Sequence, residues 1–260
     1  MITSQTVDQV ARDLFTAYDS GQPVAPPRTV IDDLSLDDAY RIQQLQERMF
    51  VDRGETVVGR KIGLTSLAMQ RQLGVDSPDF GFFTDDMVYR DTDPIPTARF
   101  IAPKVEPELG FRLSRDLPAD PSLEDVAAAI DATYLAVEII DSRVRDWDIR
   151  LVDTVADNAS CGAVILSSEP VDIPVDKLTD VVATMTVDGQ VAGQGTGADV
   201  MGHPLTPLQW LAGVLAAQSV PLKAGDVILT GSFCGAAPVA PGADVDVDYG
   251  PYGRLNITFF

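Results

Sequence analysis

The sequence predicts a mixed α+β fold, on the strength of three observations. Two amphipathic helical patterns lead the chain, short apolar segments typical of strands follow from residue 57 onward, and two further helical patterns interrupt them. Strands that cluster without regular β-α alternation favour an α+β fold over a doubly wound sheet. With 260 residues, the chain is long enough for one large domain, or for a small domain packed on a larger one.

The two leading helices follow from apolar spacing and capping signals. Apolar residues recur at helical intervals from Val7 to Tyr18, which predicts an amphipathic helix that ends near Gly21. A second helix is expected after Ser35, because Asp38 stands three residues later as an approximate capping box. The proline-rich segment between them predicts a loop rather than a domain boundary.

The predicted strands are short apolar runs, several with the period-two alternation of half-buried strands. They cover residues 56–64, 98–114, 133–140, 162–167, 181–189, 226–232, 244–250 and 254–260. Two later helices begin at recognisable start signals. One follows Ser122, with Asp125 completing a capping box, and the other starts at Thr206, with Pro207 in its first turn.

Composition and charge restrict the possible partners. The formal charge of −20 argues against nucleic acid or an anionic membrane, since both need a basic face. An anionic substrate would be repelled by the average field, so its site needs a local positive charge from a metal or a lysine. No apolar run approaches the roughly 20 residues of a membrane-spanning helix, and the first residues do not read as a signal peptide. We therefore expect a soluble, cytoplasmic protein.

Neither the cysteines nor the histidine predicts a familiar catalytic or metal motif. Cys161 and Cys234 are the only cysteines and lack metal-binding spacing, so a disulfide framework and a zinc site are not expected. His203 is the only histidine, and without a G-x-S-x-G motif a structural role is favoured over a hydrolytic triad. The glycine-rich segment GSFCGAAPVAPG lacks the pattern of a nucleotide-binding loop.

Two glutamates stand one residue apart in the predicted strand PKVEPELGF, at Glu106 and Glu108. Because strand side chains alternate between faces, the two share a face, with Cα atoms roughly 6 to 7 Å apart, and can converge on one ion. The alternative is that both simply face water. Pro107, between them, lacks an N–H, so we expect this strand to lie at an edge or to contain a bulge.

A third carboxylate strengthens the metal hypothesis. Glu138 lies inside the apolar run YLAVEII, where an ionised side chain must be paired or coordinated because burying a lone charge is costly. Three carboxylates without a nearby histidine suit a hard, octahedral cation such as Mg²⁺ or Mn²⁺. Asp141 could replace Glu138 in this set.

Lys61 precedes a turn in the apolar segment GRKIGLTS. Burial there disfavours its charged form unless an acid or an anionic ligand meets it, and a surface lysine with a buried stem is the alternative. Asp79, in SPDFG, would usually be a turn-capping residue. The polar residues of VADNAS are most simply loop or cap residues; they are Asp157, Asn158 and Ser160.

Six segments together resemble the 2-keto-4-pentenoate hydratase (2-hydroxypenta-2,4-dienoate hydratase) family. They are VVGRKIGLTS, MQRQLGVDSPDFG, PKVEPELGF, AVEIIDSRVRDWDIRLVDTVADNASCG, GHPLTPLQWLA and LKAGDVILTGS, in the same order from about residue 38 to the end. The family belongs to the fumarylacetoacetase-like superfamily, so the resemblance implies a mixed β-roll core, a helical N-terminal portion and a divalent metal. We expect the helical portion over residues 1–56 and the catalytic domain over residues 57–260.

Taken residue by residue, the resemblance implies that Glu106, Glu108 and Glu138 bind Mg²⁺ or Mn²⁺. It makes Lys61 the active-site lysine and Asp79 its acidic partner, and it places Ser160 in the substrate pocket. Hydrolytic relatives in the superfamily activate water with a histidine and a glutamate, and the lone His203 does not match that pattern. Carbon–carbon hydrolysis is therefore not expected.

The implied activity is the addition of water to 2-hydroxypenta-2,4-dienoate, giving 4-hydroxy-2-oxopentanoate, by a homo-oligomeric enzyme of aromatic catabolism. The alternatives are 4-oxalocrotonate decarboxylation, hydration of longer or dicarboxylic dienoates and, in a different class, a non-catalytic metal-binding partner subunit. A second basic residue that meets a distal carboxylate would indicate a dicarboxylic substrate. The candidates for it are Arg60, Arg143 and Arg145.

Overall fold

The computed structural model describes residues 4–66, 70, 77–218 and 220–260. Its helices are α1 (Ser4–Ser20), α2 (Pro27–Val30), α3 (Leu36–Asp52), α5 (Leu123–Ala129), α6 (Leu151–Ala156) and α7 (Thr206–Ala217). Its strands are β1 (Val57–Gly63), β2 (Asp79–Thr84), β3 (Val88–Arg90), β4 (Lys104–Leu113), β5 (Ile130–Ile140), β6 (Cys161–Leu166), β7 (Val182–Val187), β8 (Gln190–Thr196), β9 (Val227–Leu229), β10 (Ala237–Pro238), β11 (Asp244–Asp248) and β12 (Arg254–Thr258). The predicted α+β class is confirmed. Part of the motif MQRQLGVDSPDFG, at 69 and 71–76, lies outside the described residues.

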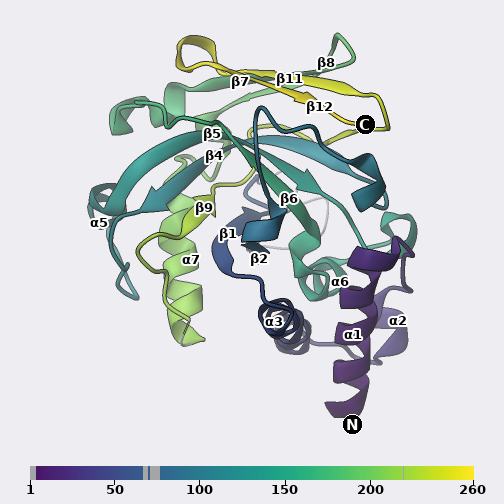
Figure 1. Ribbon diagram of the computed structural model, residues 1–260. Helices are drawn as coiled ribbons and strands as arrows, with labels where there is room; N and C mark the ends of the chain where they lie inside the picture. Colours follow the sequence, from purple (N-terminus) through teal and green to yellow (C-terminus); the bar gives the residue numbers. More distant parts are fainter. Residues whose placement is uncertain (1–3, 67–69, 71–76, 219) are drawn as a thin grey trace.

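Two sheets lie one above the other, with helices beneath the larger one (Figure 1). The larger sheet has the order β2-β1-β9-β4-β5-β6-β3, with β10 also paired to β4, and the smaller has the order β12-β11-β7-β8. The larger sheet is mixed, because β1 pairs parallel to β9 and β3 pairs parallel to β6 while its other pairs are antiparallel. This arrangement agrees with the predicted mixed β-roll.

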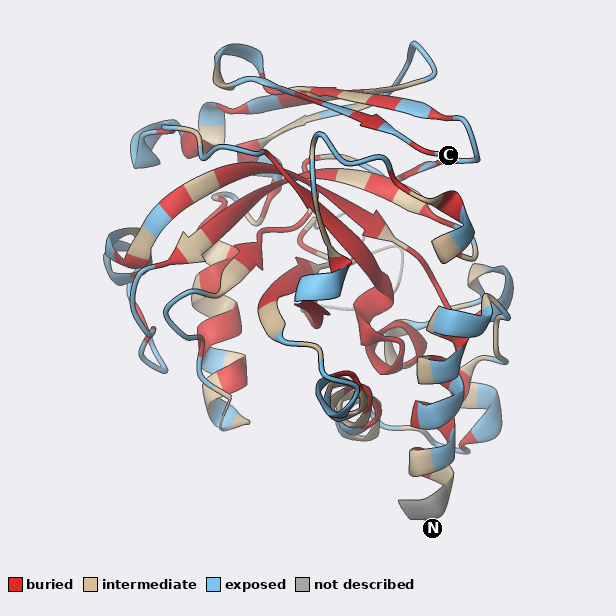
Figure 2. Ribbon diagram, in the orientation of Figure 1, coloured by how far each residue is buried: buried red, intermediate tan, exposed pale blue. Residues whose placement is uncertain are grey.

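Strands β4 and β5 are buried on both faces (Figure 2). One face carries large apolar side chains, such as Leu109, Leu135 and Val137, that join a core shared with the smaller sheet and α7. The other face carries Tyr134 and Ala136 in a second core beside β2 and β6. The three predicted glutamate ligands belong to this second face, because they alternate with the residues of the first.

The N-terminal helices pack on the larger part of the chain through a third core. It joins α1 and α3 to α6 and the preceding loop, and its members include Val10, Leu14, Ile42 and Val155. Two buried glutamines of α3 add hydrogen bonds from their side-chain amides. Gln43 donates to the backbone oxygens of Phe80 (2.9 Å) and Val155 (3.1 Å), and Gln46 donates to that of Ala156 (2.7 Å). The helical portion therefore supports β2 and α6 directly.

The predicted start signals of the helices are confirmed. The Ser35 hydroxyl accepts from the backbone N–H of Asp38 at the start of α3, and Ser122 and Asp125 form a reciprocal capping box at the start of α5. His203 has the structural role expected of it, since its Nδ1 accepts the N–H of Leu205 in the turn before α7. No helix within the described ranges has both the length and the apolar character needed to cross a bilayer.

Several elements were not predicted. Helix α2 lies in a segment interpreted as a loop, and α6 was not predicted and overlaps the segment VADNAS only at Val155 and Ala156. Strand β8 was missed because its sequence, QVAGQGT, is rich in glycine and poor in apolar residues. The interpretation of Asp79 as a turn-capping residue is wrong: it is the first residue of β2, and all six residues of that strand are buried. Residue composition alone identifies Ser, Pro, Asp and Gly as residues that favour turns. It does not show that the segment is buried in the fold.

Candidate metal centre and active site

Three glutamates converge on the inner face of β4 and β5. Glu106 and Glu138 are direct cross-strand partners in the antiparallel register, and Glu108 lies two residues further along β4. Each contributes a carboxylate oxygen to a group whose members lie within 4.8 Å of one another. Glu108 and Glu138 are 1% exposed, and Glu106 is partly exposed. Asp141, the alternative to Glu138, is used elsewhere, because its carboxylate accepts the N–H groups of Ile101 (2.9 Å) and Ala102 (2.7 Å).

Pro107 is accommodated in an internal strand, so the expectation of an edge or a bulge at this point is wrong. On the side of β4 away from β5, β10 pairs with Lys104 and Val105 and β9 pairs from Gly110 onward. The backbone oxygen of Pro107 falls in the interval between them and accepts the N–H of Phe233 at 2.9 Å. Because N and O of one strand residue point to the same side, the missing N–H faces this interval and removes no ladder bond.

The carboxylates have unused capacity for a cation. Glu108 Oε2 accepts the N–H of Gly231 at 2.8 Å. Within the described residues, the buried side-chain oxygens without a hydrogen-bond partner include Asp79 Oδ1, Glu108 Oε1 and Glu138 Oε2, while Glu138 Oε1 has an ion pair with Lys61 Nζ at 3.1 Å. Buried polar groups are normally satisfied, so this concentration indicates a ligand. An all-oxygen donor set fits a hard divalent cation.

Electrostatics supports the same interpretation. Burial, followed by the charge of Glu138, raises the pKa of Glu106 to about 7. Burial and the charges of Glu138 and Glu106 raise the pKa of Glu108 well above its ordinary value. Burial also raises the pKa of Glu138, against the opposing effect of Lys61. Without a cation these carboxylates repel one another in a poorly solvated space, and a divalent ion would remove that repulsion.

Lys61 supplies a positive charge next to the glutamates. It lies in β1, is 3% exposed, and places Nζ 3.1 Å from Glu138 Oε1. Burial lowers the pKa of Lys61, but the charges of Glu138 and Asp79 more than offset this effect and raise it overall. The surface-lysine alternative is therefore wrong, and the ammonium is kept charged by its acidic neighbours.

Asp79 lies beside Lys61 through the pairing of β1 with β2, in which Gly63 faces Asp79. A Cβ atom on Gly63 would lie only 2.2 Å from Asp79 Oδ1 and 3.5 Å from Lys61 Nζ, so a glycine is needed at this position for both groups to approach. Asp79 is 2% exposed. Burial raises its pKa to about 6, with Lys61 opposing this shift. The structure thus brings together Lys61, Asp79 and the three glutamates.

Comparison with known proteins agrees with this geometry. The family model described as "Fumarylacetoacetate (FAA) hydrolase C-terminal" matches residues 47–259. The chain belongs to the fumarylacetoacetate hydrolase family. It is 43% identical to the 2-keto-4-pentenoate hydratase of Paraburkholderia xenovorans (strain LB400), over 99% of this chain and 96% of that protein. It is 38% identical to the 2-hydroxyhexa-2,4-dienoate hydratase of Comamonas testosteroni, over 100% and 99% of the two chains.

A solved structure extends the likeness to the whole fold of this fumarylacetoacetate hydrolase family member. The 4-oxalocrotonate decarboxylase from Pseudomonas putida G7, complexed with magnesium and adipate, superposes with a TM-score of 0.94 at 32% identity and covers 100% of this chain and 99% of that one. The expected fumarylacetoacetase-like fold and the resemblance to the hydratases are both confirmed. The likeness includes a magnesium-bound relative, which agrees with the acidic group found here.

Ser160, which the family resemblance places in the substrate pocket, is buried in an unusual turn. Asn158, Ala159 and Ser160 have φ values of 53°, 48° and 54°, a left-handed conformation that L-residues rarely adopt in succession. The Ser160 hydroxyl lies 3.2 Å from Thr154 Oγ1 and 3.4 Å from Asp157 Oδ2. Its contact with a substrate stays a prediction.

Asn158 fixes this turn to the edge of the larger sheet. Its side-chain amide donates to the backbone oxygen of Phe82 at 2.9 Å, and its Oδ1 accepts the Phe82 N–H at 2.8 Å. The side chain thus pairs with β2 as a neighbouring strand would. Asn158 lies in the turn between α6 and β6, as its interpretation as a loop residue predicted, but the sequence did not indicate that its side chain is completely buried.

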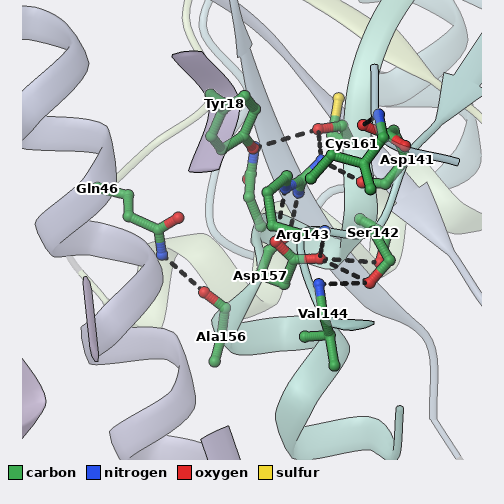
Figure 3. Close-up of polar contacts among 12 residues, drawn as sticks. Tyr18, Gln46, Asp141, Ser142, Arg143, Val144, Ala156, Asp157 and Cys161 are labelled. Atoms are coloured by element: carbon green, nitrogen blue, oxygen red, sulfur yellow. Dashed lines mark hydrogen bonds and ion pairs between the residues drawn. The ribbon is translucent and has the colours of Figure 1, made fainter. Parts of the chain in front are cut away.

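A buried ion pair beneath the site was also missed (Figure 3). Arg143 Nε donates to Asp157 Oδ1 at 2.6 Å, and its other nitrogens donate to the backbone oxygens of Asp141, Asp157 and Cys161. The Tyr18 ring of α1 lies 4.2 Å from the guanidinium, and its hydroxyl donates to Cys161 O at 3.2 Å. The Cys161 thiol itself has its pKa raised by burial and by the charge of Glu138. The network therefore anchors the start of β6 beside Glu138.

The three arginines proposed to meet a distal carboxylate of the substrate either pair with residues of the protein or lie at the surface. Arg143 is engaged in the buried network. Arg60 forms a bidentate ion pair with Glu47, with both distances 2.7 Å, and Arg145 is exposed in a turn. The sequence contains one signal for the buried Arg143 network, the closely spaced charged residues of DSRVRDWD, residues 141–148. Such a run indicates that some of these charges form a network, but it does not show which residues pair.

Proposed function

We propose that the protein is a divalent-metal-dependent hydro-lyase that adds water to 2-hydroxypenta-2,4-dienoate to give 4-hydroxy-2-oxopentanoate. The observation that carries the proposal is the buried group of three carboxylates with Lys61 and Asp79 beside it, in a chain that matches hydratases over its whole length. In this proposal Glu106, Glu108 and Glu138 hold Mg²⁺ or Mn²⁺. The bound cation supplies positive charge for the substrate carboxylate and the neighbouring 2-oxygen.

The chain's own residues would then move the protons. The 2-hydroxyl of the dienol loses its proton as C5 gains one, which gives the conjugated 2-oxo-enoate, and water then adds its oxygen to C4 and a proton to C3. Lys61 is the group we assign to proton transfer, since its ammonium is buried and adjacent to the proposed metal ligands. Asp79 would orient Lys61 and accept a proton from it or from the substrate, consistent with a pKa raised to about 6.

The proposal also includes a cytoplasmic location and assembly as a homo-oligomer, which light scattering after size exclusion would measure. Ser160 is included as a substrate-binding residue because it directly precedes β6, whose first residue lies beside Glu138. The division into a helical portion, 1–56, and a catalytic domain, 57–260, is part of the same proposal.

The second candidate is decarboxylation of 4-oxalocrotonate, which the TM-score of 0.94 to a decarboxylase favours. The hydratase is preferred because identity to the hydratase of P. xenovorans is 43%, against 32% to the decarboxylase. A non-catalytic metal-binding partner is disfavoured, because buried unpaired carboxylates reduce stability and a scaffold has no need of them.

The test is an assay of purified protein with freshly generated 2-hydroxypenta-2,4-dienoate, following the loss of dienol absorbance with Mg²⁺ or Mn²⁺ and with excess EDTA. Metal-dependent loss that yields 4-hydroxy-2-oxopentanoate without carbon dioxide is the expected result. Release of carbon dioxide from 4-oxalocrotonate, with no turnover of the dienoate, would select the decarboxylase. No turnover of either would reject both.

A further inference from the structure

Lys104 stands at the open end of the glutamate row. Lys104, Glu106 and Glu108 occupy alternate positions on β4 and therefore share its inner face. Burial changes along this row: Glu108 is 1% exposed, whereas Glu106 and Lys104 are both partly exposed. Glu138, opposite Glu106, is also 1% exposed. The Lys104 end is therefore the more exposed end of the glutamate row.

The Lys104 ammonium is held over an aromatic ring and forms no direct ion pair, although its charge acts to lower the pKa of the neighbouring Glu106. Its Nζ lies 3.9 Å from the ring centroid of Trp147. Within the described residues no carboxylate oxygen lies within 4 Å of it, although the chain has 39 acidic residues. The other three lysines all have such partners: Lys61 with Glu138, Lys177 with Asp176 and Asp180, and Lys223 with Asp116. A partly buried ammonium that forms no direct ion pair retains its N–H donors for an anion.

The ring beneath Lys104 is fixed in place. Trp147 Nε1 donates to the backbone oxygen of Ala102 at 3.0 Å, which ties the indole to the residues that precede β4. Asp146 and Trp147 have φ values of 59° and 54°, so the turn that presents the ring adopts a conformation unfavourable for side chains of this size. The ring shields one side of the Lys104 ammonium from water and attracts its positive charge. Both effects limit the number of conformations that the Lys104 side chain samples.

We propose that Lys104, held over Trp147 at the entrance, is a specificity-determining residue that receives a carboxylate of the anionic substrate. The inference rests on the proposed function, because the substrate is a 2-hydroxy-dienoate. The net charge of −20 repels such an anion, and the Lys104 ammonium supplies a local positive charge that attracts it. Lys61 cannot perform this role in the same way, because its ammonium is 3.1 Å from Glu138. Lys104 acts on binding and entry and takes no part in proton transfer.

The kinetic test compares Lys104→Met with Lys177→Met, which removes the same charge from an exposed position in the 3-10 helix Val175–Asp180. We expect Lys104→Met to lower kcat/KM about tenfold, mainly through KM, with the loss shrinking as salt rises. Lys177→Met should stay within about twofold of the parent. Equal behaviour of the two variants would overturn the proposal, and so would a fall in kcat at unchanged KM.

The binding test needs no turnover. Trp210→Phe leaves Trp147 as the sole tryptophan, so its fluorescence reports on the Lys104 contact. Pyruvate and adipate are titrated in the presence of Mg²⁺, and Lys104→Met in this background should weaken binding of at least one of them about tenfold. A larger effect on adipate identifies a tail carboxylate as the partner, and equal effects identify the carboxylate shared by all substrates.

These outcomes separate the inference from the proposed function. If the parent binds both anions through Lys104 but turns over no dienoate, the hydratase proposal fails and the anion site stands. If Lys104→Met weakens Mg²⁺ binding and leaves anion binding unchanged, Lys104 only supports the glutamates and the inference is wrong. Trp147→Leu should reproduce part of the effect of Lys104→Met, because it removes the ring that holds the ammonium.

Discussion

Lys61 and Glu138 form the contact on which the proposed chemistry depends most directly. The pair is buried, and the ammonium has a second acid, Asp79, close by. A charged lysine that gives its proton to C5 becomes neutral, so a neighbouring base must take up the proton that the 2-hydroxyl loses and return it to the lysine. Asp79, with a pKa near 6, is suited to that exchange around neutral pH.

We predict that Lys61→Ala lowers kcat on the order of 10² to 10⁴-fold, the usual effect of losing a general acid-base group. Metal binding should survive, because the three glutamates remain. Steady-state kinetics and calorimetric titration with Mn²⁺ would measure the two effects. Lys61→Met keeps the buried stem and tests whether folding alone explains the loss. Near-normal turnover in either variant would remove Lys61 from the mechanism.

Gly63 offers a test of geometry rather than of charge. In Gly63→Ala the new Cβ would lie 2.2 Å from Asp79 Oδ1, so the carboxylate must move away from Lys61. We expect kcat to fall at least about tenfold, since small displacements of a positioned catalytic group are costly. The matched control is Gly213→Ala in α7, where the nearest atom would be 3.5 Å away. If both variants had equal activity, the approach of Asp79 to Lys61 would not matter for catalysis.

At the scale of elements, the segment that follows β9 helps to build the site. Strand β9 pairs with both β1 and β4 and ends at Leu229, after which the N–H groups of Thr230 and Phe233 still donate to β4. The N–H of Gly231, between them, donates to the Glu108 carboxylate. Asn158 stabilises the outer edge of the same region by pairing with β2.

We expect Asn158→Ala to destabilise the fold, because both the N–H and the C=O of Phe82 lose their partners. Each buried unpaired group costs roughly 1–3 kcal/mol, so the free energy of unfolding should fall by an amount in that range or above it. Denaturant melts would measure the change. Asn256→Ala, on the exposed face of β12, serves as the control. A loss no larger than that of the control would show that water replaces the Asn158 amide.

Some elements of this arrangement can be predicted from the sequence, and others cannot. Apolar periodicity and capping signals predicted α1, α3, α5 and α7, because those signals are local. The glutamates could be named because their spacing along β4 and the apolar surroundings of Glu138 are also local properties. The pairing of Asn158 with β2 and of Arg143 with Asp157 could not be predicted, since each partner is identified only after the chain has folded.

At the scale of the whole molecule, the helical portion and the sheets share their cores. Tyr18, Gln43 and Gln46 donate to backbone oxygens beyond residue 57, and α1 and α3 pack on α6. We predict that a fragment of residues 57–260 does not fold cooperatively, because these acceptors and this apolar surface would be exposed. Circular dichroism and thermal melts of the fragment would test this. A cooperative transition at the temperature of the full chain would make 57–260 an independent domain.

Metal, pH and stability are linked through Glu106. Its carboxyl has a pKa of about 7 in the folded protein against an ordinary 4.5, so the metal-free fold binds the extra proton between these values. The stability contributed by this group is therefore present at low pH and is lost as pH rises through about 7. A cation must displace the same proton, so its affinity should weaken about tenfold for each unit below pH 7.

The corresponding prediction is that Mg²⁺ raises Tm more at pH 8 than at pH 5.5. Differential scanning fluorimetry with Mg²⁺ and with EDTA at both pH values would measure it. Glu106→Gln, which cannot titrate, should show a smaller pH dependence of the Mg²⁺ effect, and the remainder would come from Glu108 and Glu138, whose pKa values are also raised. An equal Mg²⁺ effect on the parent at both pH values would show that no proton is displaced from the site.

By itself, the sequence determined the residue types of the site and the family to which the chain belongs. Carboxylates in apolar strands and a lysine in a buried strand are costly, and that cost can be recognised from neighbours in sequence. Only the tertiary structure decided which of them meet. In the fold, Glu138 rather than Asp141 belongs to the acidic group, and Arg60 and Arg143 form structural ion pairs. Lys104 lies beside Trp147 without a direct ion pair. Strand register and packing fix these distances, and both depend on contacts between residues far apart in the chain.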